Sequence, residues 1–258
     1  MVLKWRIWKN YALGLGVVLS LILFAAGIGI LNIPVLCRAE TVAVGCPTGG
    51  PYVPDKNTVL LMHFDEGTGH PKDSSSFEND GTLKGDATWT GEGKFGGALN
   101  FAGVNGYVDA GNDDSLGLTG PLTIEAWVKP IATPGEDKGL LGRIGGIAGG
   151  YMLFYGSRNN PYAYMVTTDQ GHHFIPSGIV FEEGEWQHVA LTYDGISTVK
   201  WYLNGKNVEI ETKPTSGKIV TVKNIRFIIG MYGNDRFYKG LMDEVRVSNI
   251  VREFTPTK

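Results

Sequence analysis

The residue whose setting most needs a chemical explanation is Asp243, in the segment LMDEVRV at residues 241–247. Side chains alternate between the two faces of a β-strand. A strand over this segment places the Asp243 carboxylate on one face with three apolar side chains, those of Leu241, Val245 and Val247. A carboxylate among apolar side chains is costly unless hydrogen-bond donors or a cation neutralise it. The sequence therefore predicts either a bound cation at Asp243 or a carboxylate held by hydrogen bonds alone.

A second group of candidates consists of tyrosines that alternate with planar polar side chains in and near two predicted loops. Its members are Tyr155, Arg158, Asn159, Tyr162, Tyr164, Asn234, Arg236 and Tyr238. Sugars have apolar faces and hydroxylated rims, so a sugar site often combines an aromatic platform with polar side chains. Tyrosine is also common at protein interfaces, and many loop tyrosines bind nothing. These residues predict a site for a glycan or for a protein ligand, and an ordinary structural role is the alternative.

The strands that position these residues are organised around residues 184–211, GEWQHVALTYDGISTVKWYLNGKNVEIE. The dipeptides Asp194-Gly195 and Asn204-Gly205 favour tight hairpin turns because they tolerate positive φ. Between these turns, apolar and polar residues alternate with the period of a strand that has one buried face. The chain contains 37 glycines in 258 residues, and its short strands and turns favour a β-sandwich or barrel over an α/β fold. We therefore expect an all-β domain.

The N-terminus is the exception, because residues 11–33 predict a transmembrane helix. The run from Tyr11 to Leu31 carries no charge, and as a helix it is about 31 Å long, enough to span a bilayer. Three basic residues and no acidic one precede the run, so the positive-inside rule places residues 1–10 in the cytoplasm and the C-terminal domain outside the cell. A cleaved signal peptide is the alternative, with Cys37-Arg38-Ala39 as its cleavage site. We expect the uncleaved anchor, because the run is longer than the usual core of a signal peptide.

Residues 34–57 are rich in proline and glycine and predict a stalk between the membrane and the domain. The only cysteines, Cys37 and Cys46, both lie in this stalk, where the oxidising exterior permits a disulfide between them. The first 38 residues contain basic residues but no acidic one. The remainder of the chain, which includes the domain, has 19 basic and 26 acidic residues. This negative charge argues against nucleic acid or anionic lipid as the partner of the domain.

Six motifs in order then suggest a family. They are FDEGTG (64–69), GGALNF (96–101), LTIEAWVKP (122–130), EWQHVALTYDG (185–195), WYLNGK (201–206) and YKGLMDEVRV (238–247). In this order they resemble the laminin-G-like, concanavalin A-like lectin and glucanase jelly rolls, over about residues 58–252. The resemblance implies a two-sheet antiparallel jelly-roll sandwich at residues 58–258, with its first and last strands close together.

The resemblance also bears on cofactor and activity. Members of this family often hold a structural Ca²⁺ where the first and last strands meet, which implies a site at Asp243, with Asp65 and Asp73 nearby as oxygen ligands. Catalytic relatives carry a Glu-x-Asp-x-Glu or Glu-x-Asp-x-x-Glu run that supplies paired carboxylates. Such a run is absent here, so the sequence predicts a protein that is not an enzyme.

These observations together predict a single-pass protein of the cell membrane that presents one laminin-G-like domain to the exterior. The predicted function is binding or adhesion, with carbohydrate as the favoured ligand. One alternative is a surface-layer or virion component, in which the sandwich makes protein-protein contacts and self-associates. A glycan-processing enzyme is the second alternative.

Overall fold

The computed structural model describes residues 51–131, 137–208, 216–254 and 256. The predicted cytoplasmic segment 1–10, the membrane helix 11–33 and the cysteines Cys37 and Cys46 lie outside these residues. Within the described ranges, no helix is both long enough and apolar enough to cross a membrane.

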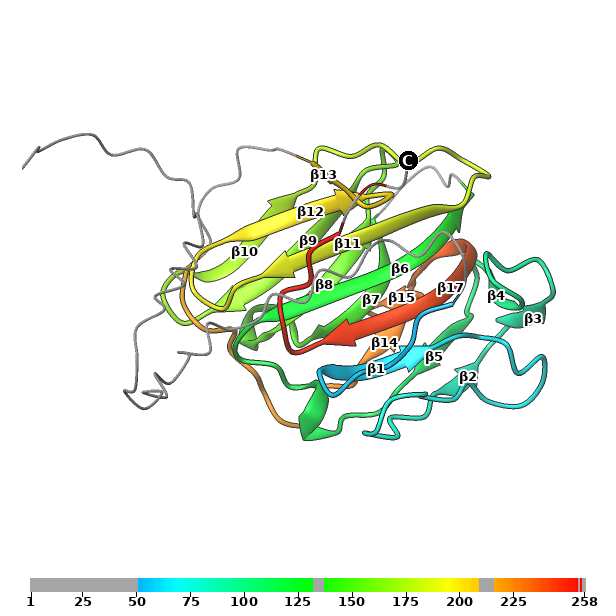
Figure 1. The fold of residues 1–258 in the computed structure, drawn as a ribbon, viewed down its shortest axis with the longest axis horizontal. Helices are drawn as coiled ribbons and strands as arrows, with labels where there is room; N and C mark the ends of the chain where they lie inside the picture. The colour runs from blue at the N-terminus through cyan, green and yellow to red at the C-terminus, as the bar shows by residue number, and fades with distance from the viewer. Residues whose placement is uncertain (1–50, 132–136, 209–215, 255, 257–258) are drawn as a thin grey trace, which may run out of the picture. The chain divides into compact units, whose positions relative to one another are not determined.

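Two large antiparallel sheets pack face to face to form the domain (Figure 1). Across the eight-stranded sheet the strands run β13 (Lys206–Val208), β12 (Val199–Leu203), β11 (Gln187–Tyr193), β6 (Leu122–Pro130), β17 (Lys239–Ser248), β4 (Ala98–Ala102) and β3 (Thr88–Thr90), and β1 (Thr58–Met62) pairs with β17. Across the seven-stranded sheet they run β10 (Gly171–Pro176), β9 (Pro161–Thr167), β8 (Gly150–Tyr155), β7 (Lys138–Ile144), β14 (Ile228–Ile229), β5 (Tyr107–Asp109) and β2 (Thr82–Lys84).

The remaining elements are small. Strands β15 (Met231–Tyr232) and β16 (Arg236–Phe237) form a separate hairpin. Two single 3-10 turns, η1 (Asp114–Leu116) and η2 (Gly146–Ala148), are the only helical segments within the described ranges. The prediction of an all-β, two-sheet antiparallel sandwich is therefore confirmed for this part of the chain.

The predicted meander is strands β11, β12 and β13, which pair in chain order. Strand β11 lies between β6 and β12, as its apolar residues on both faces indicated. The first and last strands, β1 and β17, pair directly, as the family resemblance implied. Strands β4 and β5 follow each other in the sequence but do not form a hairpin, because they belong to opposite sheets.

The hydrophobic core lies between the two sheets. It takes side chains from both, such as Phe101 and Trp201 from one sheet and Tyr151 and Leu153 from the other. Burial of this apolar surface is the main favourable contribution to folding. Each sheet also has an outer face, and the two outer faces differ in what covers them.

A β-bulge in β17 corrects the prediction for the side chain of Asp243. The pairing with β6 shifts between Asp243 and Arg246, and Glu244 adopts a φ of +51°. The extra residue reverses the alternation along the strand. Met242 and Val245 consequently lie in the core, whereas Asp243 pairs with Trp127 on the outer face. Asp243 is fully buried, as expected, but it does not share a face with Val245 and Val247.

Candidate functional site

Apolar side chains gather on the outer face of the seven-stranded sheet. Alternation along β8 and β9 directs Met152, Phe154, Tyr162 and Tyr164 to this face, while Leu153 and Ala163 enter the core. Phe154 pairs with Tyr162, and Met152 with Tyr164. The two strands are thus apolar on both faces, and the outer one forms a cluster of its own.

Ring stacking makes this outer cluster a continuous aromatic surface. The rings of Phe154 and Tyr162 lie parallel, with centroids 4.9 Å apart and an interplanar angle of 3°. Phe174 on β10 extends the surface, with its centroid 4.6 Å from that of Tyr162, and its side chain is 57% exposed. Tyr164 stacks on His172 at 5.7 Å. Each such ring pair stabilises the arrangement by about 0.5–1.5 kcal/mol, in addition to the free energy gained from burial of the rings.

The β15–β16 hairpin forms the opposite wall. It lies across β7 because Gly139 has no side chain there: a Cβ at Gly139 would come within 2.3 Å of the Met231 backbone. The hairpin carries Tyr232, whose ring meets that of Phe154 edge-on at 4.9 Å. The Arg236 guanidinium carbon lies 5.5 Å from the centroid of the Tyr232 ring. Tyr232 and Arg236 therefore project from the hairpin beside the aromatic surface.

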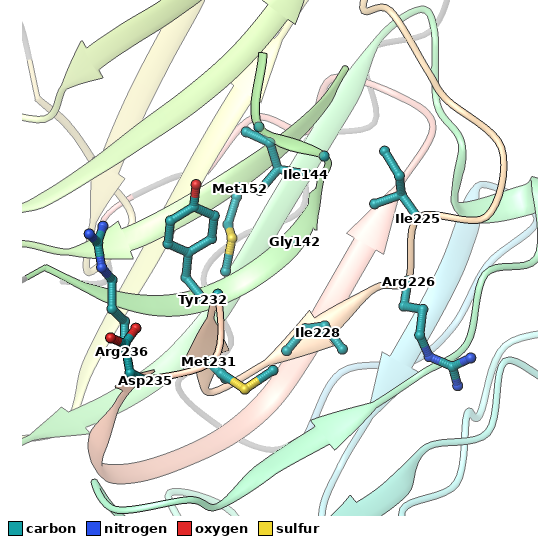
Figure 2. A pocket seen from close by; sticks show the side chains of 13 residues that line it. Gly142, Ile144, Met152, Ile225, Arg226, Ile228, Met231, Tyr232, Asp235 and Arg236 are labelled. Atoms are coloured by element: carbon teal, nitrogen blue, oxygen red, sulfur yellow. The ribbon is translucent and has the colours of Figure 1, made fainter. Parts of the chain in front are cut away.

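The hairpin and the sheet enclose a groove with two hollows. The larger has a volume of about 490 Å³, and its lining includes Ile144, Met152, Ile225, Ile228 and Met231. Figure 2 shows this hollow, with Tyr232 and Arg236 on one side and Ile225 on the other. The smaller has a volume of about 230 Å³, and aromatic side chains dominate it: Phe154, Tyr162, Tyr164 and Tyr232. Four residues, Ile144, Gly146, Tyr232 and Arg236, line both hollows. We call this combined feature the outer groove.

Few polar groups accompany these apolar side chains. The Tyr162 hydroxyl donates to Asp137 Oδ2 at 2.8 Å, and burial together with this bond raises the pKa of the phenol. The Tyr164 hydroxyl lies 2.9 Å from His172 Nδ1. The guanidinium of Arg226 is paired with Asp109 and points away from the larger hollow in Figure 2. The outer groove thus has no strong excess of either charge.

The structure sorts the predicted ligand-binding residues into three groups, in the outer groove, in the core and in turns. Tyr162, Tyr164 and Arg236 come together in the outer groove, although Tyr162 is only 8% exposed and belongs to its floor. The prediction is wrong for Tyr155 and Tyr238, because both are buried in the core between the sheets, where their rings are 5.9 Å apart.

The polar residues of the prediction occupy turns. Arg158 and Asn159 belong to the turn between β8 and β9, and Asn159 Oδ1 accepts a bond from the Tyr155 hydroxyl. Asn234 is exposed in the β15–β16 turn. None of the three lines either hollow. Sequence reasoning did not assign Tyr232 to the site, although it lies in the same aromatic segment as Arg236.

The hydrogen bonds around Asp243 satisfy only one of its two carboxylate oxygens. Its Oδ2 accepts from the Phe95 backbone N–H at 2.9 Å, whereas Oδ1 is buried without a hydrogen-bond partner. Burial raises the pKa of Asp243 to about 7. A buried acceptor of this kind fits a cation ligand, since an unpaired carboxylate oxygen is costly inside a protein.

The two other predicted metal ligands do not join Asp243 in a cluster. Asp73 is saturated by its own loop, since it accepts bonds from Leu61 N, Ser75 N, Ser75 Oγ and Asn79 N. Asp65 Oδ1 accepts from Gly97 N at 2.6 Å. In the part of the chain that is described, no group of three or more His, Cys, Asp or Glu side chains is arranged to hold a metal ion. The three aspartates are therefore not gathered into one site, and Asp243 keeps a buried oxygen without a hydrogen-bond partner.

The outer face of the eight-stranded sheet carries a network of buried charged residues instead. Arg246 Nε donates to Glu125 Oε1 at 2.8 Å, and His188 Nε2 lies 3.0 Å from Glu125 Oε2. Burial acts to raise the pKa of Glu125, but the charge of Arg246 and the bond to His188 lower it to about 2. The Glu244 carboxylate accepts from Tyr52 N at 2.7 Å and lies 2.6 Å from His63 Nδ1.

Both ends of the described chain cover this network. Tyr52 packs with Leu61 and Trp127 on the outer face, and Phe254 packs with Ala190 and Tyr202. Arg252 clamps the two ends together, donating to both oxygens of Asp55 at 2.9 and 2.8 Å. In Figure 1 the C-terminal segment, in red, runs over β6 and β11. These charged groups are closed off from ligands.

Comparison with solved structures finds domains of similar fold. The binding domain of Paraclostridial Mosquitocidal Protein 1 matches with a TM-score of 0.61 and 14% identity, over 76% of this chain and 49% of that one. Domain 4 of AbnA, an extracellular arabinanase from Geobacillus stearothermophilus solved with arabinotriose, matches with a TM-score of 0.60 and 20% identity, over 74% of this chain and 92% of that one.

A third similar structure is the binding domain of botulinum neurotoxin DC in complex with rat synaptotagmin II. It has a TM-score of 0.58 and 13% identity, over 75% of this chain and 48% of that one. The chain thus spans about half the length of the toxin domains that it matches. At these identities the likeness concerns the fold alone.

Sequence comparison gives the family. No curated protein matches the chain. The family model Laminin_G_3, described as the concanavalin A-like lectin/glucanases superfamily, matches residues 102–255, which include β6 to β17 and most of the outer groove. The chain belongs to the Laminin_G_3 family of the concanavalin A-like lectin/glucanase superfamily.

Proposed function

We propose that this domain is a carbohydrate-binding module whose site is the outer groove. The observation that carries the proposal is the wall of Tyr164, Tyr232 and Arg236 beside two hollows. A sugar ring would stack on an exposed aromatic face, and Arg236 and the tyrosine hydroxyls would bind its hydroxyl groups. The arabinotriose complex of a domain with a similar fold supports the choice of ligand class.

We further propose that the domain binds its ligand without altering it. The buried carboxylates Glu125 and Glu244 are engaged by Arg246 and His63 on the covered face, away from the outer groove. The groove itself holds no pair of carboxylates among its lining residues, since Asp235 is the only acidic one. A retaining or inverting glycosidase needs two such groups.

The proposal also includes a membrane anchor and a calcium site. The apolar run at residues 11–33 would anchor the protein in the cell membrane, with the domain on the extracellular side. A Ca²⁺ ion would be held by Asp243 through its free Oδ1, with further oxygen ligands from groups other than Asp73. A bound ion would supply the positive charge that this buried carboxylate lacks.

A protein ligand, including a second copy of this chain, is the alternative occupant of the outer groove. The groove is rich in tyrosine, methionine and arginine and contains no lysine or glutamate, which is the composition of protein interfaces. Ile147, at the rim of the smaller hollow, is 76% exposed.

The test is binding of the full chain, reconstituted in lipid nanodiscs, to a glycan array, with sedimentation of the same sample to detect self-association. We expect glycan binding that Tyr232→Ala abolishes and that Phe77→Ala leaves intact, because Phe77 is a partly exposed aromatic outside the groove. Self-association lost in Tyr232→Ala, with no glycan bound, would favour the protein ligand instead.

A further inference from the structure

The two hollows of the outer groove differ in chemistry. The smaller is lined by four aromatic rings, from Phe154, Tyr162, Tyr164 and Tyr232. The larger has only the Tyr232 ring, and its other side chains are mostly aliphatic or thioether: Ile144, Met152, Ile225, Ile228 and Met231. A sugar face stacks well on an aromatic ring. The larger hollow offers mainly branched and flexible apolar groups.

Polar groups are scarce in the larger hollow. Arg226 is paired with Asp109 on its far side, and Asp235 and Arg236 carry opposite charges. The remaining lining is glycine backbone, at Gly142, Gly145, Gly146 and Gly233. Gly142 lies within the β7 ladder, paired with Met152 and Ile228, so its backbone groups are committed to the sheet. This hollow is complementary to an uncharged group.

A second sugar ring is a poor occupant for such a hollow. Each hydroxyl that leaves water without a new hydrogen bond costs about 1–3 kcal/mol. An alkyl or acyl group incurs no such penalty and gains from leaving water. The hollow is also continuous with the aromatic one, because Ile144, Gly146, Tyr232 and Arg236 line both.

We propose that the outer groove recognises an amphipathic glycan, with a sugar in the aromatic hollow and an apolar substituent in the aliphatic hollow. The substituent is either an acyl ester on the sugar or an apolar aglycone. Tyr232 and Arg236 line both hollows and so lie at the junction, where the sugar joins its substituent. This inference rests on the proposed function and names its ligand class.

The test uses the full chain in lipid nanodiscs and soluble probes, titrated by calorimetry. The probes are free glucose, galactose and arabinose, their methyl, propyl and hexyl glycosides, and xylotriose with and without O-acetyl groups. Empty nanodiscs serve as the control for partition into lipid. We expect the affinity to rise from methyl to hexyl, by up to roughly fourfold for each methylene that becomes fully buried. The acetylated xylotriose separates acyl esters from aglycones as the source of the apolar group.

Variants assign the effect to the hollows. Ile225→Ser in the larger hollow should remove most of the gain in affinity from methyl to hexyl glycosides. Tyr164→Ala in the smaller hollow should weaken all glycosides alike. Ile196→Ser is the matched control, since Ile196 is 70% exposed and lines neither hollow.

The outcomes separate this inference from the proposed function. Sugars that bind equally well with and without an apolar substituent would overturn the inference and leave the carbohydrate site standing. Hexanol is titrated as a further probe. It would also overturn the inference if it bound as tightly as the hexyl glycosides, because the sugar would then contribute nothing. Absence of binding by every probe and on the glycan array would refute the proposed function itself.

Discussion

The two outer faces of this sandwich reverse the usual distribution of polar and apolar side chains. The eight-stranded sheet carries Glu125, His188 and Arg246 on its outer face, and all three are almost completely buried. The seven-stranded sheet carries aromatic and aliphatic side chains on its outer face, of which Phe174 is open to solvent and Tyr164 is partly exposed. Charged groups are covered, and apolar groups are exposed.

The chain ends explain the first face. The segments around Tyr52 and Phe254 cover the eight-stranded sheet, so charged side chains there pair with one another instead of with water. Nothing comparable covers the second face within the described residues, apart from the β15–β16 hairpin that forms a wall of the outer groove. Large exposed apolar surfaces on soluble domains usually mark binding sites. The comparison supports the proposal that the second face recognises a ligand, while the first contributes to stability.

Arg246→Ala gives the largest expected effect. It leaves Glu125 buried without its main partner, and breaking a buried ion pair from one side typically costs about 3–5 kcal/mol. We expect the free energy of unfolding, measured in urea, to fall by that amount, while Arg158→Ala at an exposed turn changes it by less than about 0.5 kcal/mol. Equal stability of the two variants would show that the covered network does not support the fold.

Calcium at Asp243 is the next largest effect. An ion that binds only the folded state stabilises it by about 2.7 kcal/mol at a hundredfold excess over Kd. For a domain of this size, removal should lower Tm by roughly 5–10 °C. We expect a chelator to lower the Tm of the wild type but hardly that of Asp243→Asn. Identical melting with chelator and with millimolar Ca²⁺, together with no metal by elemental analysis, would eliminate the calcium site.

Tyr232→Ala tests the open face. It removes the ring that lines both hollows, and we expect glycan affinity to fall roughly tenfold, which corresponds to about 1.4 kcal/mol. Because Tyr232 is partly exposed, the free energy of unfolding should change less than with Tyr162→Ala, whose ring is buried against Phe154. A larger loss of stability with Tyr232→Ala than with Tyr162→Ala would show that Tyr232 serves the packing of the fold and not the binding site.

The sequence was sufficient to predict the fold class because the patterns that define strands and turns are local. Turn dipeptides such as Asn204-Gly205 and the alternation that precedes them define the meander directly. The orientation of Asp243 could not be predicted, since nothing in LMDEVRV indicates a bulge and glutamate rarely adopts positive φ. Glu244 and Arg246 in the same segment are also buried, which strand alternation alone does not predict.

The candidate site was predicted only in part for a similar reason. Strand β8 is apolar on both faces, so its sequence does not reveal that Tyr155 enters the core while Phe154 faces the groove. The outer groove also depends on the β15–β16 hairpin crossing β7, a contact between segments that are distant in sequence. Tyrosine content located the region, but the register of the strands decides which rings a ligand can reach.

The smallest expected effect concerns the clamp between the chain ends, and it depends on pH. Burial acts to raise the pKa of Asp55, but its bonds to Arg252 lower it from 3.8 to about 2. A carboxyl whose folded pKa is depressed stabilises the fold above its unfolded pKa, and this stabilisation is lost as the pH falls through about 2. The Asp55 side chain is 36% exposed, so solvent screening limits the effect to less than about 1 kcal/mol.

We expect Asp55→Asn to be less stable than the wild type above about pH 4, with the difference shrinking toward pH 2, in urea titrations at each pH. Asp114→Asn, at an exposed site, should follow the wild type throughout. A difference between Asp55→Asn and the wild type that stays constant down to pH 2 would show that the ionic form of Asp55 does not hold the chain ends together.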